Sequence, residues 1–152
     1  MIEHVSLRCT RPKRSRDFYA KALAPIGYIQ DWVFGDSYAF FHKGHHDFWV
    51  TRGNVGTPLH IAFRCDTRDQ VDAFYEAAIA AGGRDNGKPG LRPENGPNYY
   101  AAFVFDPDGH NIEAVTFSKR RKAPRRSSGR RQAAGASRRT ATTRARRRRT
   151  GA

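Results

Sequence analysis

Residues 4–9 read HVSLRC and residues 60–65, which lie 56 positions later, read HIAFRC. The two stretches match in residue type at every position. The same offset aligns residues 18–19 with 74–75, both FY, and Gly27 with Gly83. One offset that holds over about 24 residues, in two copies only, indicates an internally duplicated domain rather than a solenoid. We therefore expect two related halves, at about residues 1–55 and 56–118.

Each half repeats the same order of predicted elements. Apolar and polar residues alternate in the opening stretches, as in a strand with one buried face. A helix follows each strand: the first begins at Pro12 and ends by residues 25–27, and the second begins with a capping box at residues 67–70 (TRDQ) and stops at Gly82-Gly83. Three more strands are expected per half, at residues 28–34, 37–42 and 47–52, then 84–92, 99–105 and 111–117. The sequence thus predicts an α+β fold of two pseudo-symmetric βαβββ modules.

The charge of the chain is concentrated at one end. The 152 residues carry a formal net charge of +14, but 15 of the 28 Lys and Arg residues lie in residues 119–152, which contain no Asp or Glu. The first 118 residues therefore have a net charge of −1. Residues 119–152 also lack every large apolar side chain, so they have nothing to bury against the entropy cost of ordering. We expect one folded domain at residues 1–118 and a disordered Arg-rich basic tail at 119–152.

Composition also limits the cellular setting. No apolar run approaches the 18 or so residues of a membrane span, and residues 1–4 do not begin a signal peptide. Cys9 and Cys65 are too few for a disulfide framework, and no Cys-x-x-Cys pair suggests zinc. These observations predict a cytoplasmic protein that does not enter a membrane.

The alternating pattern places three possible metal ligands on one side of the sheets. His4 and His60 occupy equivalent places on the polar faces of the opening strands. In the last strand the small apolar pair Ile112 and Ala114 suits the helix side, which leaves Glu113 facing the histidines. Two imidazoles and one carboxylate can hold a divalent metal and leave positions open for a substrate. Taken alone, each of these residues is more often structural, and it is their joint pattern that favours a site.

Three segments carry a resemblance to a known family. Residues 3–7 (EHVSL), 59–63 (LHIAF) and especially 106–113 (DPDGHNIE) resemble the vicinal oxygen chelate superfamily of glyoxalases, extradiol dioxygenases, fosfomycin-resistance enzymes and bleomycin-resistance proteins. The resemblance covers residues 1–118 and implies paired βαβββ modules whose curved mixed sheets enclose a cavity. It says little about the reaction, because one scaffold serves many chemistries.

Carried over by position, the resemblance makes His4, His60 and Glu113 the metal ligands and Glu113 the catalytic carboxylate. It does not distinguish Fe, Zn, Ni or Mn as the divalent metal. Glyoxalase I has a fourth, carboxylate ligand in the first module. Aligning residues 49–51 (WVT) with 114–116 (AVT) places Phe48 there, and a slip of one residue would offer Asp47. The sequence therefore favours a three-ligand site.

Five further residues are candidates for substrate binding. Arg8 and Arg64 lie on the same strand faces as the histidines and could hold a carboxylate or phosphate. Trp49 and Tyr100, with Tyr99 and Phe40, could form an aromatic wall. Arg92 opens the segment 92–97, where related proteins place a substrate-contacting loop, often with a His or Tyr that this segment lacks.

The leading functional hypothesis is a metal-dependent, glyoxalase-like enzyme of the lyase, isomerase or dioxygenase type, acting on a small oxygen-rich substrate. The rival is a metal-free protein of the bleomycin-resistance type that sequesters a small molecule. We also expect a homodimer, with the metal ligands coming from one chain or from two. The basic tail predicts non-specific, salt-dependent binding of nucleic acid or another polyanion, which truncation after Ser118 would abolish.

Overall fold

The computed structural model describes residues 2–119, within a compact unit that spans Met1–Arg121. Nearly all of the predicted basic tail lies outside the described residues, and so does the polyanion binding expected of it. No helix in the described part of the chain is long and apolar enough to cross a membrane.

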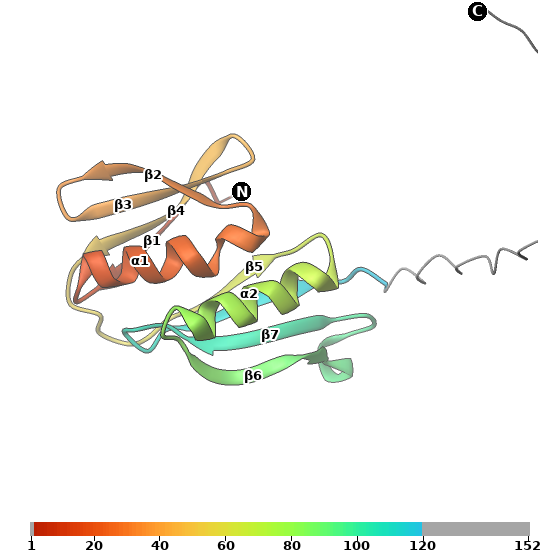
Figure 1. Ribbon diagram of the computed structural model, residues 1–152. Helices are drawn as coiled ribbons and strands as arrows, with labels where there is room; N and C mark the ends of the chain where they lie inside the picture. The colour runs from red at the N-terminus through yellow and green to blue at the C-terminus, as the bar shows by residue number, and fades with distance from the viewer. Residues whose placement is uncertain (1, 120–152) are drawn as a thin grey trace, which may run out of the picture. The chain divides into compact units, whose positions relative to one another are not determined.

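The first module forms a four-stranded mixed sheet with one helix against it (Figure 1). The strand order is β1-β4-β3-β2, with β1 parallel to β4 and the other pairs antiparallel. Its elements are β1 (Val5–Cys9), α1 (Pro12–Ala22), the short 3₁₀ helix η1 (Ala24–Ile26), β2 (Ile29–Phe34), β3 (Ser37–His42) and β4 (His45–Arg52).

The second module repeats this architecture, in the order β5-β8-β7-β6. Again the opening strand runs parallel to the closing one, and the other pairs are antiparallel. Its elements are β5 (His60–Arg64), α2 (Arg68–Ala80), β6 (Arg84–Leu91), the 3₁₀ helix η2 (Pro93–Asn95), β7 (Tyr100–Phe105) and β8 (Asn111–Thr116). The predicted α+β fold of two βαβββ modules is confirmed.

Local sequence signals explain where the helices begin. The Thr67 side chain accepts a hydrogen bond from the Gln70 backbone, and the Gln70 side chain accepts one from the Thr67 backbone, which is the complete capping box at the start of α2. Pro12 occupies the first turn of α1, where its missing N–H costs nothing. Gly27 ends η1 with a φ of 94°, a left-handed conformation that glycine adopts without strain.

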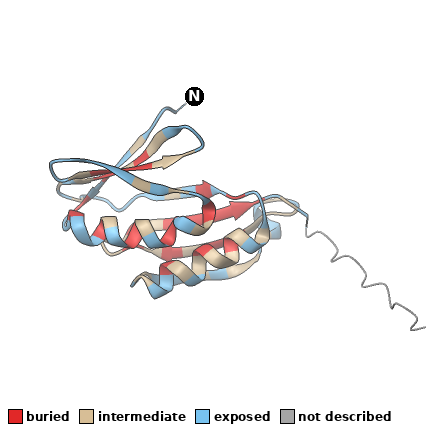
Figure 2. Cartoon of the chain, turned by 45° about the horizontal axis from the view of Figure 1, so that its top comes forward, coloured by how far each residue is buried: buried red, intermediate tan, exposed pale blue. Residues whose placement is uncertain are grey.

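The core lies between the helices and the sheets (Figure 2). Phe18 and Tyr19 of α1 and Phe74 of α2 are fully buried, as are Ile112 and Ala114 on the helix side of β8. The two helices pack against each other, and α2 also packs on β7 and β8. The opposite faces of the two sheets remain for function, as the alternating pattern predicts.

The turn at residues 106–110 joins the two modules. Asp106 accepts a hydrogen bond from the Tyr19 hydroxyl at 2.6 Å. His110 is 1 % exposed: its Nδ1 accepts from the Leu59 backbone N–H, so its Nε2 carries the proton and donates to the Arg8 carbonyl at 2.9 Å. The motif that carries the family resemblance therefore fastens the second module to β1 and α1.

Candidate metal and substrate site

Glu113 and His60 form the centre of the site on the open face of the second sheet. In the sheet register Glu113 lies between Ala62 of β5 and Phe103 of β7. Its carboxylate is only 2 % exposed, and its Oε2 lies 3.1 Å from His60 Nε2. A buried carboxylate needs hydrogen-bond or charge partners, because burial removes its hydration and an isolated carboxylate has nothing to replace that stabilisation.

The other ring nitrogen of His60 fixes how the imidazole is used. Nδ1 lies 3.1 Å from the backbone oxygen of Asn111, which can only accept, so Nδ1 carries a proton. Nε2 then faces the carboxylate either as the second N–H of an imidazolium or as a free lone pair with a cation between it and Glu113. A histidine that binds a metal through one ring nitrogen usually donates the N–H of the other to a carboxylate or a backbone carbonyl, as Nδ1 of His60 does here. The donor pair fits part of a divalent-metal site.

Tyr99 holds the second oxygen of Glu113. Its hydroxyl donates to Glu113 Oε1 at 2.6 Å, and this hydrogen bond, with burial, raises the pKa of Tyr99 to about 12. The sequence named Tyr99 only as part of an aromatic wall and found no tyrosine in residues 92–97. The residue that contacts Glu113 lies two positions beyond that segment, after Asn98, which has a φ of 62°. Its place directly after the predicted substrate loop is the signal that could have identified it.

His4 lies apart from this pair. It is on the first module, where it contacts Glu3 and its ring lies 6.3 Å from that of Trp49. Within residues 2–119 of one chain, no three His, Cys, Asp or Glu side chains come together as a possible metal site. The three ligands implied by the resemblance are therefore not assembled by a single described chain: His60 and Glu113 meet, and His4 does not join them.

The position equivalent to Glu113 in the first module is occupied by Trp49. Ser6 pairs with Trp49 in β4, just as its counterpart Ala62 pairs with Glu113 in β8. The sequence alignment that placed Phe48 there is wrong by one residue, because the sheet register and not residue similarity sets the equivalence. An indole cannot replace the fourth carboxylate of glyoxalase I. Asp47, the alternative, instead accepts a hydrogen bond from the Tyr28 hydroxyl.

The predicted substrate residues divide between three places. Arg64 and Arg92 flank the Glu113 face, stacked over the rings of Phe117 and Phe103. Arg8 and Trp49 lie on the first module, where Arg8 donates to the Arg52 carbonyl. Tyr100 faces α2 instead: its hydroxyl donates to Asp72 at 2.7 Å, and the Arg68 guanidinium lies over its ring. The structure thus places Tyr100 on the helix side of the sheet, away from Glu113.

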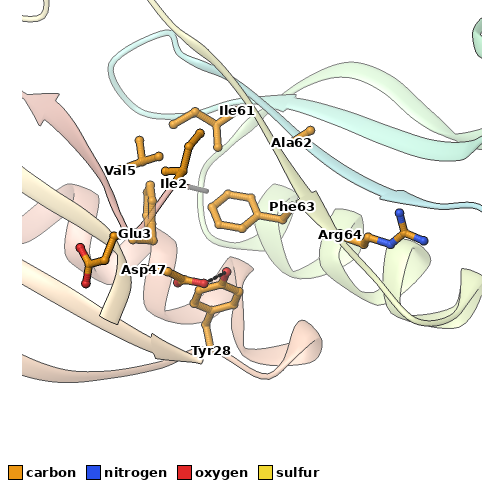
Figure 3. Close-up of a pocket in the computed structure, with 10 residues that line it drawn as sticks. Ile2, Glu3, Val5, Tyr28, Asp47, Ile61, Ala62, Phe63 and Arg64 are labelled. Atoms are coloured by element: carbon orange, nitrogen blue, oxygen red, sulfur yellow. Dashed lines mark hydrogen bonds between the residues drawn. The ribbon is translucent and has the colours of Figure 1, made fainter. Parts of the chain in front are cut away.

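A pocket of about 210 Å³ lies between the two modules, along β1 and β5 (Figure 3). Tyr28 and Asp47 form one side of it, and burial raises the pKa of Tyr28 well above its ordinary value. Asp47 Oδ1 is buried with no hydrogen-bond partner in the described part of the chain. Ala62 and Arg64 line this pocket too, whereas His60 and Glu113 do not.

The two cysteines are free and buried on the helix side. Burial raises the pKa of the Cys65 thiol to about 11, so this thiol stays protonated and a poor nucleophile at neutral pH. Neither cysteine belongs to the site.

Comparison with known proteins identifies the class to which this fold and site belong. Residues 1–114 match the family model of the glyoxalase/bleomycin resistance protein/dioxygenase superfamily, so the chain is a member of that superfamily. Among curated proteins, none matches the sequence.

Solved structures agree with this assignment. A glyoxalase/bleomycin resistance protein from Albidiferax ferrireducens T118 is 28% identical, with a TM-score of 0.63, over 75% of this chain and 96% of that one. Two more distant structures share the fold: a glyoxalase-related enzyme from Fulvimarina pelagi (17% identity, TM-score 0.62, covering 76% of this chain and 87% of that one) and a superfamily enzyme from Burkholderia phytofirmans PsJN (15%, 0.63, 77% and 98%).

Proposed function

We propose that this protein is a metal-dependent enzyme of the glyoxalase-like type, with its reaction centre at Glu113. One observation carries the proposal: His60 donates Nδ1–H to a backbone carbonyl and turns Nε2 toward a carboxylate that is almost fully buried. Such a pair is unfavourable without a proton or a cation between its members. Family membership supports a cation, because superfamily members include metal-dependent enzymes.

His4 of a second copy would complete the ligand set. His4 lies on the open face of the first sheet, and His60 and Glu113 lie on the open face of the second, so two chains related by a twofold axis can bring these faces together. Exposed apolar side chains on β2 supply a surface for such a homodimer. Soluble monomers rarely expose large contiguous apolar patches, so exposed apolar residues on one strand favour contact with a partner. They are Ile29, Trp32, Val33 and Phe34, with exposed fractions of 62, 51, 51 and 76%.

The residues around Glu113 suit proton transfer at a small oxygen-rich substrate. A divalent metal bound there would supply Lewis-acid stabilisation of an enolate or oxyanion. Glu113 accepts a proton from the carbon beside the substrate's carbonyl carbon, which leaves an enolate, and then returns that proton to the enolate at carbon or oxygen. Tyr99 holds Oε1 throughout, which keeps the carboxylate oriented, and the rings of Phe103 and Phe117 form apolar walls that limit water.

Metal analysis tests the proposal. Full-length protein purified without chelator should contain close to one divalent metal per completed site, by mass spectrometry of the eluted ions. His60→Ala and Glu113→Gln should each lower occupancy at least tenfold, because ligand loss removes a coordinate bond. His4→Ala should do the same if the second copy completes the set.

His45→Ala is the matched control, since His45 is exposed at the start of β4 and belongs to the other sheet. It should leave the metal content unchanged. A protein with no stoichiometric metal, or an equal loss in His45→Ala and His60→Ala, would refute the metal site.

A metal-free binding protein is the second candidate, and one observation favours it. The Trp32 and Trp49 rings lie 5.3 Å apart on the first sheet, with His4 and His46 beside Trp49. Such an aromatic group could stack on a planar ligand. Ligand binding that persists after dialysis against a chelator, with no metal before it, would select this candidate. We place either activity in the cytoplasm, in keeping with two unpaired thiols.

A further inference from the structure

The open face around Glu113 carries more positive charge than its single carboxylate balances. Three arginines lie on this face, each with its guanidinium over a phenylalanine ring: Arg64 over Phe117 at 5.0 Å, Arg84 over Phe105 at 4.3 Å and Arg92 over Phe103 at 5.7 Å. Stacking occupies the flat face of a guanidinium and leaves its N–H edge available for a planar anion.

The three guanidinium groups differ in how far their donors are already used. Arg92 donates to the Lys88 carbonyl at 2.7 Å and more weakly to that of Leu91. The Arg92 side chain lies across β6 where Gly87 and Gly90 have no side chain, and an added Cβ at either glycine would lie within 3.4 Å of Arg92. The guanidinium groups of Arg64 and Arg84 make no hydrogen bond or salt bridge to the rest of residues 2–119. Their donors are available for a ligand.

Of these two, Arg64 lies next to the reaction centre. β5 presents His60, Ala62 and Arg64 to the same face, with Ala62 paired to Glu113. Two residues along a strand span about 7 Å, so Arg64 lies one such step from the residue beside Glu113. The small Ala62 side chain leaves a space between His60 and Arg64. Arg84 lies on β6, two strand spacings or about 10 Å from β8.

Acidic neighbours do not neutralise Arg64. Glu113 is engaged by His60 and Tyr99, and of the Asp47 carboxylate only Oδ2 has a partner, the Tyr28 hydroxyl. Figure 3 shows the Arg64 guanidinium reaching away from Asp47 and Tyr28. A cation with unused donors beside a sheltered reaction centre attracts an anionic ligand group.

We propose that the substrate of this site is a small organic anion whose carboxylate or phosphate is bound by Arg64 while its reacting end lies at Glu113. This rests on the proposed function for the position of the reacting end, but Arg64 binding can be measured without it. Arg64 binds the anionic group of the ligand, and the small Ala62 side chain leaves space for the rest of the ligand. The Phe117 ring holds the Arg64 guanidinium in place.

A binding experiment on the full-length protein tests this with three matched probes: benzoate, phenyl phosphate and the neutral benzamide. Affinity is read from ¹H–¹⁵N chemical shifts of backbone amides at residues 60–64 and 101–105, so binding of anions to the distant basic residues is recognised by its place in the sequence. We expect at least tenfold tighter binding of one or both anions than of benzamide. The anion that binds more tightly shows whether the site prefers a carboxylate or a phosphate group.

Arg64→Gln should weaken anion binding about tenfold, the effect of losing one charge-assisted hydrogen bond of about 1.4 kcal/mol. The matched control Arg84→Gln removes an identical charge, also stacked on phenylalanine, and should change affinity less than twofold. If neither benzoate nor phenyl phosphate binds more tightly than benzamide, or if the two variants lose equal affinity, the proposal is overturned.

The outcome is separable from that of the metal test. A protein without metal whose anion binding depends on Arg64 supports the anion site and refutes the metal-dependent function. A protein that holds metal at His60 and Glu113 but binds anions equally well after Arg64→Gln supports the metal-dependent function and refutes the anion site.

Discussion

Asp108 is the residue where local chemistry most directly affects stability. Its carboxylate accepts hydrogen bonds from Thr10 and from the Ser15 hydroxyl of α1, so it ties the second module to the first. Burial opposes ionisation of Asp108, but these hydrogen bonds outweigh it and lower its pKa below the ordinary 3.8. The ionised form is therefore favoured more in the folded than in the unfolded chain.

Asp108→Asn should destabilise the protein by about 1 kcal/mol at pH 7, because a neutral amide accepts these hydrogen bonds less strongly. When folding lowers the pKa of a carboxyl group, its ionised form stabilises the folded chain. This stabilisation is complete at a pH above the pKa of the unfolded chain, and it is lost as the pH falls from there toward the pKa of the folded chain. The difference in free energy of unfolding between the wild type and Asp108→Asn should thus become smaller as the pH falls below about 4. Urea unfolding at pH 7, 5 and 3.5 measures it.

Asp17→Asn is the control, because Asp17 is exposed and, within residues 2–119, its carboxylate pairs only with the adjacent Arg16. It should show neither the loss at pH 7 nor the narrowing. A difference for Asp108→Asn that is constant with pH would contradict the assigned role. Asp106, whose pKa burial raises, is common to all three proteins and cancels in the comparison.

Among the elements, α2 shows how a few residues set a boundary. Thr67 and Gln70 satisfy each other's backbone N–H groups at its first turn, and Asp69 adds a negative charge near the positive end of the helix dipole. α2 in turn packs on α1, on β7, which directly follows Tyr99, and on β8, which carries Glu113. Fraying of α2 would therefore loosen the support of the site.

Thr67→Ala should lower the free energy of unfolding by about 1 kcal/mol, since the Gln70 N–H loses its acceptor. Circular dichroism during urea unfolding measures this loss. Thr67→Ser keeps the hydroxyl and should recover most of it. If alanine and serine behave alike, the capping box does not stabilise α2.

At the scale of the whole molecule, the separation of His4 from His60 and Glu113 is the central finding. The modules are joined through α1, α2 and the 106–110 turn, on the helix side. This connection leaves the apolar residues of β2 exposed. In the homodimer that we propose, covering these residues would at the same time supply His4, and assembly would then be linked to metal binding.

Phe34→Asp should therefore weaken dimerisation at least tenfold, because a carboxylate would be buried against an apolar partner. Sedimentation equilibrium measures the dissociation constant, and metal content should fall in parallel. Leu91→Asp alters an exposed apolar residue of β6 and should leave both unchanged. A monomeric wild type, or metal retained by a dissociated Phe34→Asp, would contradict the shared site.

The sequence by itself determined the duplicated βαβββ architecture and the side of β8 on which Glu113 lies. Both follow from short-range patterns: the 56-residue offset, the period of two in the strands and the capping box. It also placed Glu113 on the side that His60 faces, because the period of two puts both residues on the polar faces of their strands.

Only the tertiary structure decided which residues meet across longer distances. It placed Trp49 rather than Phe48 opposite Ser6, because register is set by hydrogen bonding between strands and not by the residue similarity that favoured Phe48. It brought Tyr99 to Glu113 through a loop whose path no periodicity encodes, and turned Tyr100 toward α2. It kept His4 apart from His60 and Glu113, since the relative placement of two modules depends on packing contacts such as Asp106 with Tyr19 that a pattern of single residues does not contain.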